Sequence, residues 1–425
     1  MNIEISKEDA SYMYDLVQNI IDEVGPRMAC SPEEFKGATI IRNEFDKVCD
    51  DAIIEDFYCS PRAFLGWTKL IVIMGFMSII LHFLTLLTLN FTILLSLSII
   101  SIMLIVSVVV IIWEEFFNYR EFIDMLFRKK KSQNVIGTFK AKGEVKNLLI
   151  FSSHNDSALQ FNLLKWLRWA SLPLLFGALL IVIIWLIISF SYFLIIAMGF
   201  LSLKSIFIIP TILLFIFGLP CFIAVFLFIP FGDKGNVVPG AVDNLSSCSV
   251  IVGLARYLKK HKDIIPPSTE IRLVSFGCEE CGLRGAYRYV EKHLNEMKNL
   301  NTSVINMDGL ETPNGFLIID YEPTTRTKHS EEVIQKLLNA TEDVNVNAKI
   351  FGSGKLEKTI GKLSGGSDAA AFSKSHIKAG FINSADWKNR SNYYHQNTDT
   401  PDKIKKGTLE NALRICIAYI LHESN

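Results

Sequence analysis

Two long stretches of this sequence contain almost no charge, and they constrain the fold more than any other feature. From Leu70 to Trp113 there is no charged side chain apart from a possible charge on His82. From Trp169 to Pro230 the only charged residue is Lys204. One helix needs about 20 apolar residues to cross the hydrocarbon core of a bilayer. The first tract therefore predicts a two-helix hairpin that turns near Thr88 to Phe91, and the second has room for two long spans or three short ones.

The composition agrees with a chain that lies partly in a lipid bilayer. Half of the 425 residues are hydrophobic, only 20% are charged, and the mean hydropathy is +0.31, which is high for a soluble protein. Basic and acidic residues balance at 43 each, so we expect no nucleic-acid partner. The eight cysteines lack the paired spacing of a disulfide framework, which predicts reduced thiols. The polar, acidic start from Met1 to Asp15 predicts no cleavable signal peptide.

The remaining sequence has the pattern of a soluble α/β protein. Short apolar runs predict strands at Asn147 to Ser153, Ile271 to Phe276 and Val304 to Met307. Apolar residues at helical spacing predict helices at Glu8 to Ile21, Pro32 to Val48 and Leu245 to Lys259.

Imidazole and carboxylate side chains follow the three predicted strands. His154 and Asp156 come after the first, Glu279 and Glu280 after the second, and Asp308 after the third. Ligand sites in open α/β sheets form outside the carboxyl ends of strands, so we expect these groups to converge on one edge of the sheet.

Two further residues can join this group. Asp243 lies at the start of the predicted helix, and His395 supplies a second imidazole. Two histidines and three carboxylates, without thiolates, suit two catalytic zinc ions that share a bridging ligand. One carboxylate of the pair Glu279-Glu280 is then left as a base.

These residues resemble the co-catalytic zinc aminopeptidase family, peptidase family M28, which includes bacterial leucyl aminopeptidases, aminopeptidase S and glutamate carboxypeptidase. The motifs that carry the resemblance are, in chain order, Gly25-Pro26-Arg27, His154 with Asp156, Gly240 to Asn244, Glu279-Glu280, Asn306-Met307-Asp308, Ser367-Asp368 with Phe372, and Tyr394-His395 before Asp399-Thr400. Each motif alone is weak, whereas all of them in family order are specific.

The resemblance implies a metallopeptidase with two zinc ions and a peptide substrate. His154 and Asp308 would bind one zinc ion, Glu280 and His395 the other, and Asp243 would bridge them. Asp156 would orient His154 as part of the catalytic apparatus, because ligand imidazoles need a fixed orientation. Glu279 would be the general base.

The implied fold is a three-layer α/β/α zinc-peptidase domain with a mixed sheet, interrupted here by two transmembrane helical hairpins. Ordinary members of the family run almost directly from the first metal strand to the bridging aspartate, whereas this chain has an apolar tract between Asp156 and Asp243. The ligands on either side must meet, so each tract has an even number of spans, and two plus two is expected. We expect peptidase segments at residues 1–66, 114–166 and 232–425, and transmembrane insertions at residues 67–113 and 167–231.

The charges beside the apolar tracts predict the orientation in the membrane. They lie at the ends that join the peptidase segments: Arg62, Lys69, Arg120, Arg128 to Lys131, Lys165, Arg168 and Lys234. The opposite ends have at most Lys204. The positive-inside rule therefore predicts a multi-pass membrane protein whose catalytic domain lies on the cytoplasmic side.

Some of these residues also fit simpler roles. Taken singly, His154 or Asp308 is better interpreted as a buried, hydrogen-bonded polar residue. Cys278 to Cys281 matches C-x-x-C, typical of a redox pair or half a zinc knuckle, but no second C-x-x-C supports it.

Three functions fit the motifs. They are a two-zinc aminopeptidase or closely related exopeptidase, an aminoacyltransferase like glutaminyl cyclase with one zinc ion, and a catalytically silent receptor or scaffold. Silence is disfavoured because every expected position carries a suitable residue. The sequence leaves open the residue preference, the choice between N-terminal and C-terminal trimming, the native metal among zinc, cobalt and manganese, and the oligomeric state.

Overall fold

A computed structural model describes residues 3–360 and 365–423 of the chain. The chain divides into two compact units. The first, which we call the sheet unit, comprises Met1–Pro61, Arg128–Gln160 and Gly232–Asn425. The second, which we call the helical unit, comprises Arg62–Phe127 and Phe161–Phe231.

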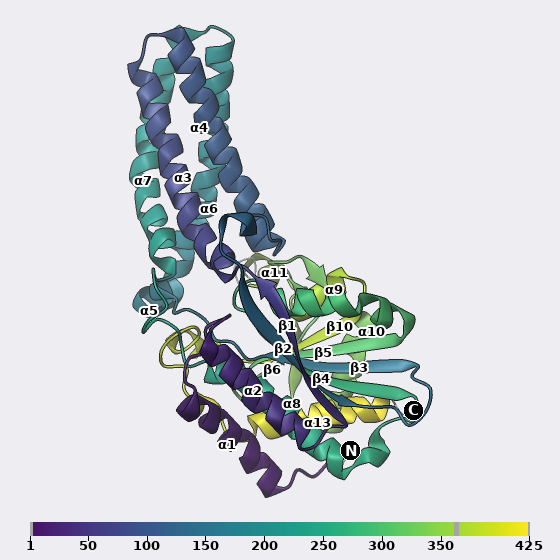
Figure 1. Ribbon diagram of the computed structural model, residues 1–425. Helices are drawn as coiled ribbons and strands as arrows, with labels where there is room; N and C mark the ends of the chain where they lie inside the picture. Colours follow the sequence, from purple (N-terminus) through teal and green to yellow (C-terminus); the bar gives the residue numbers. More distant parts are fainter. Residues whose placement is uncertain (1–2, 361–364, 424–425) are drawn as a thin grey trace. The chain divides into compact units, whose positions relative to one another are not determined.

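An eight-stranded mixed sheet forms the centre of the sheet unit (Figure 1). Its strands lie in the order β1-β2-β4-β3-β5-β10-β6-β9. β3 pairs in parallel with both β4 and β5, and β5 with β10, whereas β2 is antiparallel to its neighbours β1 and β4. The strands are β1 (Asp51–Cys59), β2 (Lys130–Phe139), β3 (Asn147–His154), β4 (Thr269–Phe276), β5 (Asn301–Leu310), β6 (Phe316–Ile319), β9 (Ala348–Phe351) and β10 (Lys378–Ser384). β7 (Tyr321–Glu322) and β8 (Thr327–Lys328) form a separate two-stranded sheet.

Helices cover both faces of the large sheet, which confirms the predicted three-layer α/β/α fold. One face packs against the helices α1 (Lys7–Glu23), α2 (Pro32–Asp46), α8 (Ser246–Lys260), α10 (Glu331–Asp343) and α13 (Thr408–His422). The other face packs against α9 (Arg284–Asn299) and α12 (Ala369–Lys374). The short helix α11 (Lys355–Ile360) follows β9.

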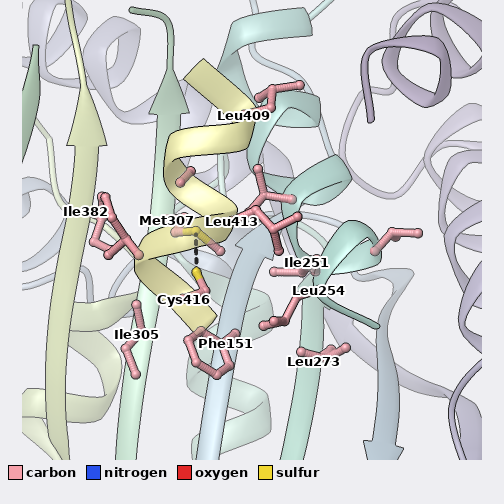
Figure 2. Close-up of a cluster of buried hydrophobic side chains, with 14 of the residues drawn as sticks. Phe151, Ile251, Leu254, Leu273, Ile305, Met307, Ile382, Leu409, Leu413 and Cys416 are labelled. Carbon is pink, nitrogen blue, oxygen red and sulfur yellow. Dashed lines mark hydrogen bonds between the residues drawn. The ribbon is translucent and has the colours of Figure 1, made fainter. Parts of the chain in front are cut away.

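Alternation along the central strand β3 explains why both faces are apolar. Leu149 and Phe151 belong to the core on the α8 and α13 side, and Leu148 and Ile150 belong to the core on the α9 side. Figure 2 shows the first core, in which α13 packs over Phe151, Ile305, Met307 and Ile382 of the sheet. Burying such a side chain stabilises the fold by about 1.5–3 kcal/mol, so this core fixes the strands whose ends carry the polar cluster.

The helical unit consists of four long helices joined in two pairs (Figure 1). The long helices are α3 (Pro61–Leu87), α4 (Phe91–Ile111), α6 (Leu172–Ala197) and α7 (Ile208–Phe228). Shorter turns extend or connect them: η1 (Ile112–Phe117), η2 (Asp124–Leu126), α5 (Asn162–Leu167), η3 (Arg168–Ser171) and η4 (Leu201–Phe207). Four helical segments of the described chain are long and apolar enough to cross a membrane, by length and composition.

The helix boundaries agree with the predicted count of two plus two. The first turn falls between Leu87 and Phe91, where Asn90 caps α4 by accepting from the N–H of Ile93. At the same end of the unit, Lys204 Nζ donates to the carbonyl oxygen of Thr88 at 2.9 Å, which brings the turns of both pairs together. Residues 192–204 divide between the end of α6, a short connection and the start of η4.

Polarity in the helical unit is reversed relative to a soluble bundle. Large apolar side chains on the outer faces are exposed, for example Met103, Ile187 and Phe217. Inside, Trp185 Nε1 donates to Ser78 Oγ at 2.9 Å, within a cluster that also joins α3 to α4 and α7. Interior polar contacts with an apolar exterior are typical of helices that face lipid.

Candidate metal centre

The polar cluster lies at the carboxyl ends of three adjacent parallel strands. His154 is the last residue of β3, and Asp156 follows it. Glu279 and Glu280 come three and four residues after the end of β4, and Asp308 lies near the end of β5. Because β4 and β5 flank β3 and run parallel to it, these segments meet at one edge of the sheet, as the sequence predicts.

Two loops supply the remaining members of the cluster. Asp243 lies in η5 (Ala241–Leu245), directly before α8, and its peptide bond to Asn244 is cis. His395 lies in the segment after η8 (Arg390–Asn392). Asp399 joins the two loops, because its carboxylate accepts from the N–H groups of Val242 at 2.9 Å and Asp243 at 3.2 Å.

Asp243 lies between the two imidazoles. Its Oδ1 is 3.3 Å from His154 Nε2, and its Oδ2 is 3.2 Å from His395 Nε2. His154 Nε2 is also 3.8 Å from Asp308 Oδ1, and His395 Nε2 is 3.5 Å from Glu280 Oε1. The structure therefore brings together all five side chains that the sequence motifs predict as metal ligands.

The chemistry of this donor set fits a metal centre. His154 Nε2 and Glu280 Oε1 are buried and make no hydrogen bond within the described residues. Ligand atoms lie within 4.8 Å of one another in two groups, His154 with Glu279 and Asp308, and His154 with Asp243 and Glu280. Buried polar atoms normally have partners, and imidazole with carboxylate is the usual donor set of catalytic zinc. His395 belongs to neither group and approaches Asp243 and Glu280 instead.

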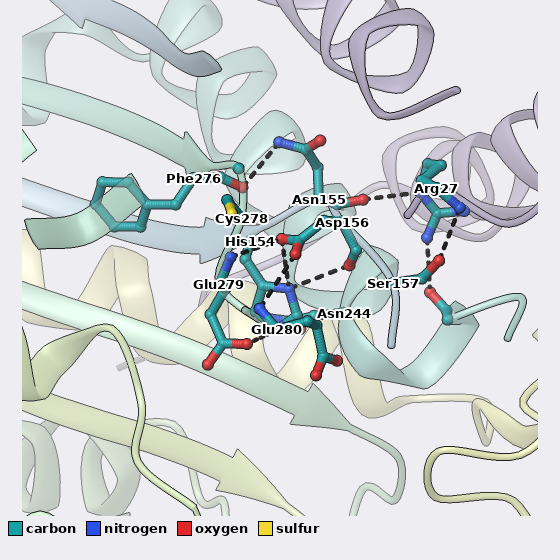
Figure 3. A network of polar contacts seen from close by, with 12 residues as sticks. Arg27, His154, Asn155, Asp156, Ser157, Asn244, Phe276, Cys278, Glu279 and Glu280 are labelled. Atoms are coloured by element: carbon teal, nitrogen blue, oxygen red, sulfur yellow. Dashed lines mark hydrogen bonds and ion pairs between the residues drawn. The ribbon is translucent and has the colours of Figure 1, made fainter. Parts of the chain in front are cut away.

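Asp156 holds both the first imidazole and the glutamate pair (Figure 3). Its Oδ1 is 3.5 Å from His154 Nδ1, and its backbone oxygen is 3.2 Å from the same nitrogen. Its two carboxylate oxygens accept from the N–H groups of Glu279 and Glu280, each at 3.1 Å. One buried carboxylate thus orients His154 and fixes the turn that presents the two glutamates.

Arg27 gives the Gly25-Pro26-Arg27 motif a structural role. Its guanidinium is buried and donates to the carbonyl oxygens of Gly25, Asn155, Pro239 and Gly240. Burial lowers its pKa to about 10, so the group remains charged at neutral pH. Arg27 therefore ties the N-terminal segment to the segment after β3 and to the loop before Asp243.

The electrostatic environment distinguishes the members of the cluster. Burial opposes ionisation of Asp243, but the adjacent imidazoles of His154 and His395 outweigh it and lower the pKa of this carboxyl group. Burial also opposes the charged form of His154, yet the surrounding carboxylates, Glu279 foremost, raise its pKa. Burial and the nearby Glu280 charge raise the pKa of Glu279 well above its usual range. Asp243 is thus the carboxylate that stays ionised, and Glu279 is suited to holding a proton.

One cationic neighbour of this centre was not predicted from the sequence. Arg390 is buried, its guanidinium lies 4.6 Å from the centre of the Tyr394 ring, and its Nη1 makes no hydrogen bond within the described part of the chain. Burial opposes its charge, but Tyr394 and Asp243 raise its pKa. No sequence pattern marks an arginine five residues before His395, so only the fold reveals it.

A mixed sheet between two helix layers carries an imidazole and carboxylate cluster at its strand ends. Residues 229–420 match the model of peptidase family M28.

Individual proteins are similar to this chain in sequence or in fold. Aminopeptidase YwaD of Bacillus subtilis (strain 168) is 33% identical over 186 residues, which are 42% of this chain and 37% of that protein. The chain thus spans little more than a third of the length of that relative. The fold is similar to BSAP, a zinc aminopeptidase from Bacillus subtilis, with a TM-score of 0.52, 16% identity, and coverage of 97% of this chain and 95% of that one. It is also similar to Fimbriiglobus ruber glutaminyl cyclase, with a TM-score of 0.55, 12% identity, and coverage of 99% and 97%.

Proposed function

We propose that this protein is a membrane-anchored, zinc-dependent exopeptidase of aminopeptidase type, which hydrolyses N-terminal residues from peptides. The observation that carries the proposal is the position of Asp243, whose two oxygens lie 3.3 and 3.2 Å from two different imidazoles. A carboxylate so placed is suited to bridging two cations. The relative that shares 33% identity over its aligned segment is named an aminopeptidase, which supports the choice of reaction.

We assign the metal ligands by this geometry and by the family motifs. His154 and Asp308 would hold one zinc ion, Glu280 and His395 the other, and Asp243 both. When bound, zinc ions polarise the scissile carbonyl group and lower the pKa of water.

The chain's own residues handle the proton and the positioning. Glu279 accepts the proton of the attacking water on a carboxylate oxygen and returns it to the leaving amine, so no covalent enzyme intermediate is needed. The buried position of Glu279 favours its return of the proton, because burial raises the pKa of this carboxyl group. The Asp156 carboxylate fixes the position of Glu279 by accepting a hydrogen bond from the backbone N–H of Glu279. Arg390 supplies a positive charge beside Asp243 and is placed to bind polar groups of the substrate.

The helical unit would anchor the protein in the lipid bilayer through four spans. Its exposed apolar side chains and its buried polar contacts support this role. We place the sheet unit on the cytoplasmic side, because the basic residues gather at the span ends that join it.

A glutaminyl-cyclase-like aminoacyltransferase is the second candidate, since glutaminyl cyclases occur among the proteins of similar fold. A peptidase consumes water and releases a free amino acid, whereas cyclisation of N-terminal glutamine releases ammonia. The two reactions are therefore separable by product. Metal stoichiometry adds a second criterion, because one zinc ion in the imidazole and carboxylate centre would favour the cyclase and two the peptidase.

The deciding experiment uses the full chain purified in detergent. It is incubated with a panel of peptides that differ at the N-terminal or the C-terminal residue, with and without a metal chelator. We expect stepwise loss of N-terminal residues, release of free amino acids, and inhibition by the chelator that zinc reverses. Trimming from the C-terminus, ammonia release alone, or no hydrolysis with a fully loaded centre would each contradict the proposal.

A further inference from the structure

Four of the eight cysteines gather beside the glutamate pair, and the proposed function uses none of them. They are Cys30 in the segment before α2, Cys59 at the end of β1, and Cys278 and Cys281, which flank Glu279 and Glu280. Cys59 Sγ lies 3.5 Å from Cys30 Sγ and 3.1 Å from Cys278 Sγ. These three sulfur atoms lie within 4.8 Å of one another, and Cys281 contacts Cys278. Cys59, Cys278 and Cys281 are buried.

The sulfur separations favour a shared metal ion over a disulfide. A disulfide needs an S–S distance of about 2.05 Å, and the described residues contain no disulfide. Thiolates around a tetrahedral zinc ion, with Zn–S of about 2.3 Å, lie roughly 3.8 Å apart. A group of three mutually close thiols with a fourth beside it matches that arrangement more closely than any single pair does.

The buried carboxylate of Glu34 positions two of these cysteines. Glu34 Oε2 accepts from the N–H of Cys30 at 2.7 Å, and Glu34 Oε1 accepts from the N–H of Cys278 at 2.9 Å. Both cysteines have left-handed backbones, with φ of 61° and 57°, a conformation that costs free energy in residues other than glycine. Hydrogen bonds to the single carboxylate of Glu34 thus hold both cysteines in this conformation. As a result, their sulfur atoms converge.

We propose that Cys30, Cys59 and Cys278 bind a structural zinc ion as thiolates, with Cys281 as the adjacent thiol that completes a four-sulfur shell. Each thiol loses its proton to solvent on binding. A structural zinc site has no open position for substrate, so this ion is distinct in role from the imidazole and carboxylate centre. The zinc ion would link the segment before α2 and the end of β1 to the turn that carries Glu279 and Glu280. It would thereby stabilise that turn.

The test is zinc K-edge X-ray absorption on the full chain, purified in detergent under reducing conditions without added zinc. The imidazole and carboxylate centre has only nitrogen and oxygen ligands, so any sulfur shell comes from the cysteines. Because the spectrum averages over all bound zinc, we expect a sulfur shell at about 2.3 Å whose amplitude corresponds to three to four sulfur ligands on one ion per chain. Replacement of the native metal by Co²⁺ should add a thiolate-to-metal charge-transfer absorption band, which nitrogen and oxygen ligands do not produce.

Two variants provide the matched comparison. Cys59→Ser should lose the sulfur shell and one equivalent of bound zinc per chain. Cys49→Ser, which changes a half-buried thiol outside the cluster, should retain both. The measurement on the unaltered chain decides the question even if Cys59→Ser fails to fold. Zinc with only nitrogen and oxygen ligands, or an intact mass two protons lower from a disulfide after anaerobic purification, would overturn the proposal. Neither result depends on peptide hydrolysis, so a failure of this proposal can be distinguished from a failure of the proposed function.

Discussion

At the scale of single residues, neighbouring carboxyl groups of the same cluster have different environments. Asp243 is flanked by two imidazoles that keep it ionised, whereas Glu279 is buried beside Glu280, which favours the protonated form. Such different environments distinguish a carboxylate suited to binding a metal from one suited to acting as an acid or base. Two substitutions in this cluster test the roles assigned to its residues.

Changing Glu279 to Gln removes the proton acceptor and keeps the shape of the side chain. We expect kcat to fall about 10²–10⁴-fold, the range for loss of a general base, with the metal content unchanged. Steady-state kinetics and elemental analysis on the same preparation measure both quantities. The control Glu291→Gln alters an exposed glutamate on α9 and should leave kcat as it is. Undiminished turnover in the Glu279→Gln protein would remove this residue from the base role.

Changing Asp156 to Asn tests a positioning residue. The amide retains only one oxygen to accept from the N–H groups of Glu279 and Glu280, and it no longer favours the fixed orientation of His154. We expect metal affinity to fall about 10–100-fold, as for other groups that orient a ligand imidazole. Metal titration measures this fall, and saturating zinc should restore part of the activity. Wild-type affinity in the Asp156→Asn protein would show that Asp156 does not orient the ligands.

At the scale of elements, an ion pair joins the edge strand β1 to helix α9. Glu55 accepts from His293 Nε2 at 3.1 Å and lies 2.8 Å from Lys292 Nζ. Burial opposes ionisation of Glu55, but these two partners outweigh it and lower its pKa below 4.5.

This shift predicts an acid-dependent loss of stability. The folded pKa lies below the unfolded pKa, so the contribution is fully present above about pH 4.5 and is lost as the pH falls through the folded value. Glu55→Gln should therefore have a lower Tm than the parent at pH 7, with the gap closing toward pH 3. Thermal unfolding across that range measures it. Asp56→Asn, beside it on β1 in an exposed pair with Lys131, should change the Tm little. An equal gap at pH 7 and pH 3 would contradict the assignment.

At the scale of the whole molecule, the two apolar tracts supply four candidate membrane spans. Both tracts interrupt the sheet unit, and each supplies a pair of helices long enough to span a bilayer. An even number of spans returns the chain to the side it left, so all parts of the metal centre share one compartment.

This arrangement predicts the outcome of a topology experiment. A reporter fused after Asn425 should give a cytoplasmic signal, because basic residues gather at the span ends that join the sheet unit. The same reporter inserted after Asn90, in the turn between α3 and α4, should give the opposite signal. An exported signal from the fusion after Asn425 would refute the orientation.

Much of the fold and of the candidate site follows from local sequence patterns. The helix pairs are fixed by runs of apolar residues, and β3, β4 and β5 by short apolar segments that end in polar ones. Five of the seven site residues lie at or near such ends, whereas Asp243 and His395 lie in loops and were selected by their place in the order of family motifs. The strands β1 and β2 were not predicted, because the tendency of a segment to form a strand depends on its neighbours in the sheet.

The tertiary structure alone decided what residues far apart in the chain do together. The C-x-x-C at Cys278 is uninformative by itself, and it gains meaning only because folding brings Cys30 and Cys59 to it. Arg390 likewise becomes part of the metal centre only in the folded chain. The sequence determined the class of fold, the membrane-type helices and the chemistry available at the strand ends, because those depend on composition and near neighbours. Which distant side chains meet depends on the register and packing of the whole sheet. No single segment of the sequence encodes that register and packing.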